Sequence, residues 1–158
     1  MFLDCNEVIA ERLWVGRYVR VNEVRQLKLM GITTVISLQS DEDLVAYGIP
    51  EKKILNAYAQ AGIALRRTGV RDFDQEAMAQ NLPQCVAELE TALAPRSARV
   101  YLHCTAGINR APTVAAAYLM KSQGMTAQGA HNLLTSRRNC SPYLGVLENY
   151  AAALNSKS

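Results

Sequence analysis

The amino-acid sequence predicts a single α/β sandwich with a small, largely parallel sheet. Three observations support this fold class. Runs of β-branched and apolar residues alternate with stretches of helical periodicity over the first two thirds of the chain. The last third carries helical patterns, and no internal repeat or linker divides residues 1–158. The length of 158 residues and the hydrophobic content of 49% suit one domain with one hydrophobic core.

Predicted strands and helices alternate through the first half of the chain. Strands are expected where β-branched and aromatic residues cluster, and helices where apolar residues recur every three or four positions. Gly16 and Gly31 are typical stops for the first strand and the first helix. In order, we expect a strand at 9–16, a helix at 22–31, a strand at 32–38, a polar loop at 39–44, a helix at 54–61 and a strand at 64–70.

The second half of the chain predicts one strand and four helices. Asn81 and Pro83 are typical of a helix start, and the apolar spacing continues to Leu93. The helix after the predicted strand is apolar nearly all round, which indicates that it is buried. In order, we expect a helix at 81–93, a strand around Val100 and Leu102, a helix at 114–123 ending at Gly124, and helices at 127–136 and 144–154 separated by a turn at 139–142.

The strongest functional signal lies in residues 99–113, RVYLHCTAGINRAPT, where a strand, a tight loop and a helix follow one another. A helix N-terminus offers unpaired N–H groups and the positive end of its dipole, so a loop that closes onto it can bind an anion. That field favours the thiolate of Cys104, which is the nucleophilic form. Gly107 permits close backbone approach, and the guanidinium of Arg110 can hold two oxygens of one phosphate. The stretch therefore predicts a phosphate site with its own nucleophile.

The spacing of cysteine and arginine is weak evidence by itself, because a chain with four cysteines shows it by chance about one time in five. His103 before the cysteine, Gly107 within the loop and the strand-loop-helix order lower the coincidence to roughly one in ten thousand. The alternative makes Cys104 a small buried apolar residue and Arg110 a surface cation. The full pattern favours the phosphate site over that alternative.

A general acid is expected opposite the nucleophile, because breaking a phosphate monoester leaves an alkoxide or phenoxide that needs a proton. Residues 71–74, Arg-Asp-Phe-Asp, follow the strand predicted at 64–70 and offer two carboxyl groups. Asp74 also suits the N-cap of the next helix, with Glu76 in its first turn. Asp72 is therefore the preferred acid. Asp74 is the alternative acid, and a purely capping or solvated role for both carboxyls is the third possibility.

Composition and cysteine usage argue against several classes of function. The net charge of +3 comes with no basic run longer than a pair, so nucleic-acid binding is not indicated. The four cysteines, at positions 5, 85, 104 and 140, lack metal-binding spacing, so we expect no metal, no cofactor and a reducing compartment, the cytoplasm. The longest apolar run, 114–120, is too short to span a bilayer, and we expect neither a signal peptide nor membrane binding.

Other conspicuous residues have structural explanations. The acidic cluster at 41–43 is expected to cap the next helix or to lie in water rather than to contact substrate. Arg137 and Arg138 could extend a positive surface near the pocket, but a solvated helix end is the preferred interpretation. Cys85 is expected in the core, and Trp14 in the core or at a sheet edge.

The segment 103–110, HCTAGINR, resembles the H-C-x-x-G-x-x-R signature of cysteine-based protein tyrosine phosphatases, specifically the small dual-specificity branch. The resemblance implies a three-layer protein tyrosine phosphatase-like fold with helices flanking the sheet. It also implies a metal-independent reaction in which a phosphocysteine forms and water then releases phosphate. Substrates would be proteins phosphorylated on tyrosine, serine or threonine, or related phosphomonoesters. The expected catalytic residues are Cys104, Arg110 and Asp72, and the expected phosphate-binding loop comprises His103, which orients it, with Thr105, Ala106, Gly107, Ile108 and Asn109.

The chain is also similar to a narrower group, the glucan phosphatases of the starch-excess and laforin type. The matching segments are SLQSDEDL at 37–44 with Gly48, RDFD at 71–74, the cysteine loop with RAP at 110–112, and SRRNCSP at 136–142. Tyr47 and Phe73 are the possible platform residues for a sugar chain, although each could equally lie in the core. The paired aromatics expected before Gly48 are reduced to Tyr47 beside Ala46, so phosphoglucan is the alternative substrate rather than the first.

Two departures from these patterns bear on the reaction. Asn109 stands where the glucan phosphatase group has a glycine, and Ala111 stands where the general dual-specificity pattern has a serine or threonine. A hydroxyl at 111 would stabilise the departing thiolate, so either Thr113 or Thr105 substitutes for it or the second step is slow. The departures also motivate a rival of another class, a phosphate-binding pseudophosphatase or scaffold.

Overall fold

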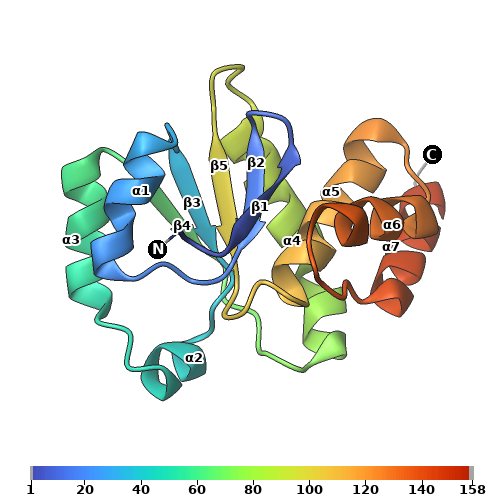
Figure 1. The fold of residues 1–158 in the computed structure, drawn as a ribbon. Coiled ribbons are helices and arrows are strands. Elements are labelled where there is room, and N and C mark those ends of the chain that lie inside the picture. Colours follow the sequence, from blue (N-terminus) through green and yellow to red (C-terminus); the bar gives the residue numbers. More distant parts are fainter. Residues whose placement is uncertain (1, 157–158) are drawn as a thin grey trace.

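The computed structural model describes residues 2–156 and shows a five-stranded sheet between two groups of helices (Figure 1). The strand order is β1-β2-β5-β3-β4. Strands β2, β5, β3 and β4 run parallel, and β1 pairs antiparallel with β2 at one edge. The strands are β1 (Cys5–Ile9), β2 (Leu13–Gly16), β3 (Thr34–Ser37), β4 (Ala64–Arg67) and β5 (Val100–His103). The predicted α/β class with a small, largely parallel sheet is confirmed.

Two layers of helices cover the sheet, with α1 and α3 on one face and α4 to α7 on the other (Figure 1). Helix α2 lies apart from both layers, beyond one end of the strands. The helical elements are η1 (Val21–Glu23), α1 (Val24–Leu29), α2 (Asp41–Ala46), α3 (Glu51–Ala61), α4 (Gln75–Leu93), α5 (Arg110–Gln123), α6 (Ala127–Arg137) and α7 (Leu144–Ser156).

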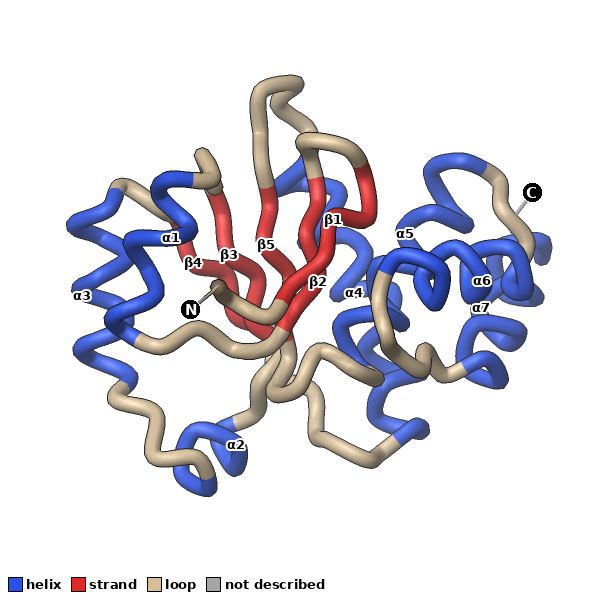
Figure 2. Tube along the Cα trace, in the orientation of Figure 1, coloured by secondary structure: helices blue, strands red, loops and turns tan. Residues whose placement is uncertain are grey.

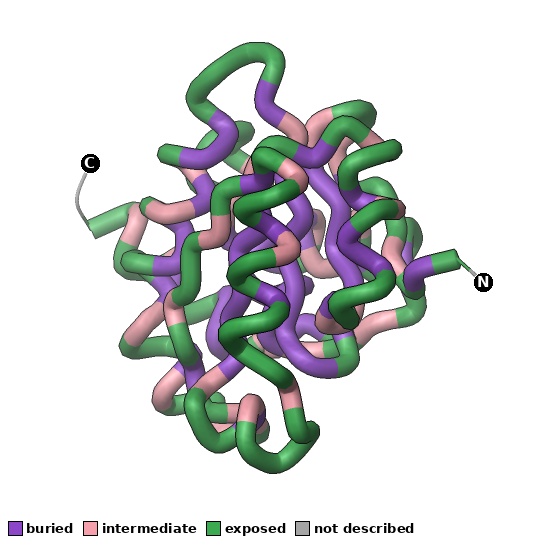
Figure 3. The backbone as a smooth tube through the Cα atoms, turned by 90° about the vertical axis from the view of Figure 1, so that its left-hand side faces the viewer, coloured by how far each residue is buried: buried purple, intermediate pink, exposed green. Residues whose placement is uncertain are grey.

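The sheet separates two apolar clusters, because successive side chains of a strand point to opposite faces. In β5, Val100 and Leu102 join the cluster under α4 to α7, while Tyr101 joins the cluster under α1 and α3. Every residue of β5 is buried, as expected for a central strand covered on both faces. Figure 3 shows the buried residues gathered inside the molecule and the exposed ones along its outer turns. The loop after β5 therefore starts from a rigid support.

The strand predicted at 9–16 is confirmed over Leu13–Gly16 and wrong before Leu13, because the chain forms a hairpin there. Strand β1 ends at Ile9 and β2 begins at Leu13. Glu11 takes a positive φ of 61° in the turn between them. Glycine and asparagine adopt this backbone conformation most often. Because the residue here is a glutamate, the sequence did not indicate a turn.

The helix predicted at 81–93 begins earlier than expected, at Gln75. The carboxylate of Asp74 caps it by accepting a hydrogen bond from the backbone N–H of Ala77 at 2.9 Å. Asn81 and Pro83 therefore lie inside α4. The proline removes one backbone hydrogen bond, but burial of the apolar face of this 19-residue helix outweighs that loss.

The polar loop predicted at 39–44 is wrong, because α2 begins at Asp41. Ser40 and Asp43 form a capping box, in which each side chain accepts a hydrogen bond from the other residue's backbone N–H. The other predicted elements are confirmed with ends that differ by a few residues, namely those at 22–31, 32–38, 54–61, 64–70, 100–102, 114–123, 127–136 and 144–154. The buried positions of Trp14 and Cys85 are also confirmed.

The loops that follow β3, β4 and β5 meet at the carboxyl ends of the parallel strands. Figure 2 shows these loops together below the sheet, with α2 beside them. Backbone hydrogen bonds join them, since the N–H of Leu38 donates to the carbonyl of His103 and that of Val70 to the carbonyl of Leu38. This end of an open α/β sheet is where ligand sites form.

Candidate active site

Residues 104–109 form a tight loop between the central strand β5 and the first turn of α5. The loop surrounds a hollow of about 100 Å³. Cys104 lies at the base of this loop and is 3% exposed. The hollow is lined by Asp72, Phe73, Cys104, Ala106, Ile108, Asn109 and Arg110. The structure therefore brings the predicted nucleophile, arginine and preferred acid to one place.

The carbonyls of the loop all turn away from the hollow, because each accepts a hydrogen bond from a group behind it. In a trans peptide, the following N–H points the opposite way. The amides of residues 105–110 are therefore directed into the hollow, as an anion cradle requires. The donor and acceptor pairs are His103 Nδ1 to Cys104 O (2.8 Å), Tyr18 N to Thr105 O (3.0 Å), Arg138 Nη2 to Ala106 O (3.0 Å), Arg138 Nε to Gly107 O (2.7 Å), Ser141 N to Ile108 O (2.7 Å) and Thr113 Oγ1 to Asn109 O (2.7 Å).

Gly107 is a loop position where any side chain would clash with its neighbours. Its φ of 72° lies in the left-handed region that favours glycine. A Cβ there would stand 2.5 Å from the backbone carbon and oxygen of Gly16 and 2.8 Å from Nη2 of Arg138. The curvature of the cradle therefore depends on this glycine.

Arg110 is 1% exposed, and one of its guanidinium nitrogens is committed to the protein. Nη1 donates to Asp43 Oδ2 at 2.7 Å and to the carbonyl oxygen of Val70 at 2.7 Å. Nη2 donates to Thr105 Oγ1 at 3.2 Å and pairs with Asp72 Oδ2 at 3.1 Å. Nε is buried and has no hydrogen-bond partner among the described residues. The edge formed by Nε and Nη2 is the one that can take two oxygens of a phosphate.

The buried carboxylate of Asp43 holds Arg110 in this orientation. Burial by itself would raise its pKa, but the hydrogen bonds from Arg110 and Ser40 together lower it. The expectation that residues 41–43 cap a helix is confirmed for Asp43, which belongs to the capping box of α2. The alternative of a carboxylate in water is wrong for Asp43, which is 7% exposed and pairs with Arg110. Ser40, three residues before Asp43, is a sequence pattern that predicts a helix cap. No neighbouring residue indicated that Asp43 would pair with Arg110, which lies 67 positions away.

The two candidate acids lie in different places. Asp72 faces the hollow, where one carboxylate oxygen contacts Arg110 and the other accepts the backbone N–H of Phe73 at 3.0 Å. Asp74 caps α4 through Ala77. The geometry therefore favours Asp72 as the group next to a bound phosphate.

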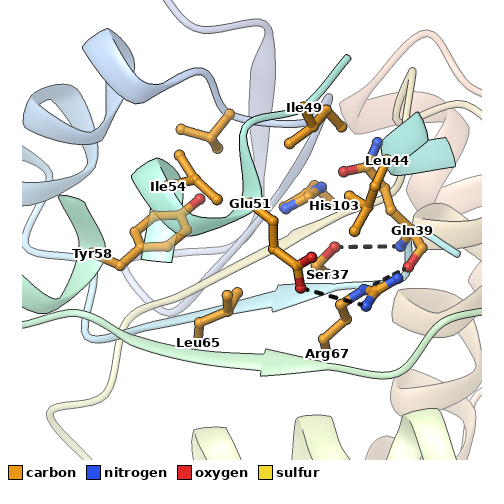
Figure 4. A pocket seen from close by; sticks show the side chains of 11 residues that line it. Ser37, Gln39, Leu44, Ile49, Glu51, Ile54, Tyr58, Leu65, Arg67 and His103 are labelled. Atoms are coloured by element: carbon orange, nitrogen blue, oxygen red, sulfur yellow. Dashed lines mark hydrogen bonds and ion pairs between the residues drawn. The ribbon is translucent and has the colours of Figure 1, made fainter. Parts of the chain in front are cut away.

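His103 lies on the inner side of the loop and is 4% exposed. Figure 4 shows its ring inside a second, small pocket, between Ile49 and Ser37. Burial is the main cause that lowers its pKa to about 4. The ring is therefore neutral near pH 7, and the hydrogen bond to the carbonyl of Cys104 requires its proton on Nδ1.

Gln39 and Arg67 connect this second pocket to the cradle, and neither was singled out from the sequence. Gln39 is buried, and its Nε2 donates to Thr105 Oγ1 at 3.0 Å. Arg67 in turn donates from Nε to the carbonyl of Gln39 at 3.0 Å, a contact drawn in Figure 4. Because Thr105 Oγ1 also accepts from Arg110, both of its lone pairs are used.

The two possible platform residues are both exposed rather than in the core. Phe73 is 83% exposed, lines the hollow beside Cys104 and has a positive φ of 56°. Tyr47 is 52% exposed, and its ring centroid lies 6.0 Å from that of Tyr18. Tyr47 and Tyr18 line a separate hollow of about 420 Å³. The backbone of Tyr18 joins this hollow to the cradle through its bond to Thr105.

The fold and the cysteine loop together define an α/β domain of the protein tyrosine phosphatase type. Residues 13–152 match the family model "Dual specificity phosphatase, catalytic domain", and the chain belongs to this family. The resemblance seen in the sequence is confirmed.

Relatives of two kinds are similar to the chain. It is 37% identical over 143 residues to "Phosphoglucan phosphatase DSP4, amyloplastic" of Castanea sativa, a match that covers 89% of this chain and 38% of that protein. It is 29% identical over 154 residues to "Dual specificity protein phosphatase 26" of Bos taurus, covering 94% of this chain and 67% of that one. The chain thus spans well under half the length of its phosphoglucan phosphatase relative.

Solved structures confirm the three-layer protein tyrosine phosphatase-like fold. The chain is similar to Tk-PTP in the active form, with a TM-score of 0.79 and 19% identity over all of both chains. It is also similar to PTPMT1 in complex with PI(5)P, with a TM-score of 0.78 and 22% identity over 98% and 99% of the two chains. Over residues 2–156, no helix has the length and apolarity to cross a membrane.

Proposed function

We propose that this domain hydrolyses phosphomonoesters through a phosphocysteine intermediate. The observation that supports this most strongly is the convergence of Cys104, the inward loop amides and the Nε/Nη2 edge of Arg110 on one hollow. Phosphoryl transfer needs an in-line nucleophile and donors for the three equatorial oxygens. These groups supply both, and membership of the dual-specificity phosphatase family supports the same reaction.

In the first step the thiolate of Cys104 attacks phosphorus, an S–P bond forms and the P–O ester bond breaks. The loop amides and Arg110 stabilise the negative charge on the non-bridging oxygens. Asp72, in its protonated form, gives its proton to the leaving oxygen. Because the bound phosphate takes the guanidinium edge, Asp72 exchanges its contact with Arg110 for one with the leaving group.

In the second step a water gives its proton to the carboxylate of Asp72 and attacks phosphorus. The S–P bond breaks, which releases inorganic phosphate and the thiolate. Thr113 is 0% exposed, donates to Asn109 O and accepts the N–H of Tyr143, so its hydroxyl is already used in the frame of the site. Thr105, whose Oγ1 accepts from Gln39 and Arg110, stays the alternative hydroxyl for the departing thiolate. Unless Thr105 takes this role, we expect the second step to be the slower one, because Ala111 stands beside the arginine. Stopped-flow assays with p-nitrophenyl phosphate should show a burst of product close to one equivalent of enzyme.

Hydrolysis of p-nitrophenyl phosphate tests the proposal. Cys104→Ser should abolish turnover and retain phosphate binding, because the cradle itself is unchanged. Cys85→Ser is the matched control, since Cys85 lies in the core within α4. Substantial hydrolysis by Cys104→Ser would refute the cysteine mechanism. A wild-type protein that binds phosphate without turnover would support the rival scaffold instead.

Phosphoproteins are the proposed first substrate class, and phosphoglucan is the second candidate. The glucan reading is favoured by the phosphoglucan phosphatase relative and by the exposed Tyr47 beside the 420 Å³ hollow. Phosphate release from phosphotyrosine and phosphoserine peptides should be compared with release from phosphorylated starch. If glucan is the substrate, Tyr47→Ala will lower release from starch and leave p-nitrophenyl phosphate hydrolysis unchanged.

The location of the protein stays a proposal. The expectation of a reducing compartment such as the cytoplasm agrees with the four unpaired cysteines. Two relatives are named as amyloplastic and chloroplastic proteins. Imaging of a fluorescent fusion of the full-length protein would decide between these compartments. Binding of nucleic acid or membranes is still not expected.

A further inference from the structure

Arg138 is a buried cation that the reaction described above does not use. It follows the last turn of α6 and is 5% exposed, so the expected solvated helix end is wrong for this residue. Its neighbour Arg137 is exposed, as expected. A guanidinium is seldom buried unless its donors are paired, so the partners of Arg138 indicate its role.

Two donors of Arg138 bind successive carbonyls of the cysteine loop. Nε donates to Gly107 O at 2.7 Å and Nη2 to Ala106 O at 3.0 Å. The planar fork of a guanidinium fixes the direction of both carbonyls at once. Because the next N–H of a trans peptide points the opposite way, the amides of Gly107 and Ile108 are aimed into the hollow. One side chain thus orients two adjacent donors of the cradle.

The other side of Arg138 is held by the N-terminal segment, more than 130 positions away. Nη1 donates to Asp4 Oδ1 at 2.9 Å and to Asn6 Oδ1 at 3.1 Å. Helix α6 packs against β1, which places these partners next to the loop (Figure 1). The side chain of Asp4 is 62% exposed, so water screens its charge while Arg138 remains buried. Asp4 also accepts from Nη2 at 3.3 Å, so its screened carboxylate offsets only part of the positive charge that Arg138 places behind the cradle.

We propose that Arg138 is a positioning residue of the phosphate site, which aims the amides of Gly107 and Ile108 and adds positive charge behind them. This proposal rests on the proposed function, because it concerns the same anion site. It assigns a role in anion binding to a side chain that lies outside the hollow.

Binding of inorganic phosphate by calorimetry tests the proposal without requiring turnover, in a Cys104→Ser background. Arg138→Met should weaken binding by about tenfold to a hundredfold, since two charge-assisted hydrogen bonds are lost. Arg138→Lys, which keeps the charge but not the fork, should weaken it by about threefold to tenfold. Arg137→Met is the matched control and should bind like the parent. Asp4→Asn should bind phosphate at least as tightly, because its amide oxygen still accepts from Arg138 while the opposing charge is gone.

A second readout separates positioning from simple stabilisation. The rate at which iodoacetamide alkylates Cys104, followed by mass spectrometry against pH, should have its midpoint at higher pH in Arg138→Met than in Arg137→Met. The other charged and titratable groups around the loop are the same in both variants, namely Arg110, Asp72, Asp43, His103, Tyr143 and Asp4. With p-nitrophenyl phosphate, KM should rise and kcat should fall in Arg138→Met.

Three results would overturn the assignment. The first is that folded Arg138→Met binds phosphate as tightly as Arg137→Met and that Cys104 is alkylated with the same pH dependence in both variants. The second is loss of affinity in Asp4→Asn as large as in Arg138→Met, which would locate the effect in the N-terminal contact. The third is that Arg138→Lys binds phosphate as tightly as the parent. If Arg138→Met does not fold, this lysine variant decides the test. Failure of the proposed function is distinguishable, because the wild type would then hydrolyse no phosphomonoester.

Discussion

Burial of His103 makes the stability of the fold depend on pH in a defined window. The unfolded chain has an ordinary histidine pKa of 6.5, whereas burial lowers the pKa of His103 to about 4. Between these values the unfolded state binds a proton that the native state does not, so the free energy of unfolding falls as the pH falls. At about 1.4 kcal/mol for each tenfold change in proton affinity, the loss from pH 7 to pH 4 is about 3 kcal/mol. The hydrogen bond to the carbonyl of Cys104 acts in the opposite direction and is the smaller effect.

Urea denaturation at pH 7.5, 5.5 and 4.5 measures this loss. His103→Gln removes the titrating group and should flatten the dependence. Asp43 and Glu23 have lowered pKa values, so their stabilisation is lost only below their ordinary values of 3.8 and 4.5. An unfolding free energy that stays constant from pH 7.5 to 4.5 in the wild type would refute the assignment of a neutral, buried ring.

Three further outcomes follow from the site. Asp72→Asn should lower kcat by about a hundredfold to ten-thousandfold, whereas Asp74→Asn should preserve kcat. The opposite ranking in steady-state assays would make Asp74 the acid. Asp43→Ala should lower the free energy of unfolding, measured by urea denaturation, by about 3–5 kcal/mol, because it leaves the charge of Arg110 buried without its carboxylate. A loss below about 1 kcal/mol would show that the Asp43–Arg110 pair does not stabilise the fold. Gly107→Ala should abolish phosphate binding in calorimetry because its Cβ meets Gly16, while Gly145→Ala, where a Cβ meets nothing within 4 Å, should bind normally.

The parts of the site that could be predicted are those encoded within a few residues. The strand before Cys104 and the helix after Arg110 follow from local apolar patterns, and Gly107 marks the curvature between them. The partners of the loop could not be predicted in this way. An aspartate such as Asp43 in the first turn of a helix has the same local pattern whether it faces water or a buried arginine. Its role depends on a contact across 67 positions, which only the fold brings together.

Arg138 shows the same limit at the other end of the chain. A basic residue at a helix C-terminus is favourable in water because of the helix dipole, so its sequence context predicts exposure. The packing of α6 against β1 buries it and supplies Asp4 and Asn6 as partners. Pro83 is the converse case, where a strong local signal for a helix start is overridden by burial along α4.

The position of Asp72 bears on whether the site is a catalyst or only a phosphate binder. A module that merely retained phosphate would need the loop amides and the Nε/Nη2 edge of Arg110. It would gain nothing from a carboxylate 3.1 Å from the same guanidinium, because that carboxylate competes with the phosphate for Nη2 and repels its negative charge. The competition disappears when Asp72 carries a proton, which is the form that a leaving oxygen needs. The contact between Asp72 and Arg110 therefore favours an enzyme over a scaffold, independently of the cysteine.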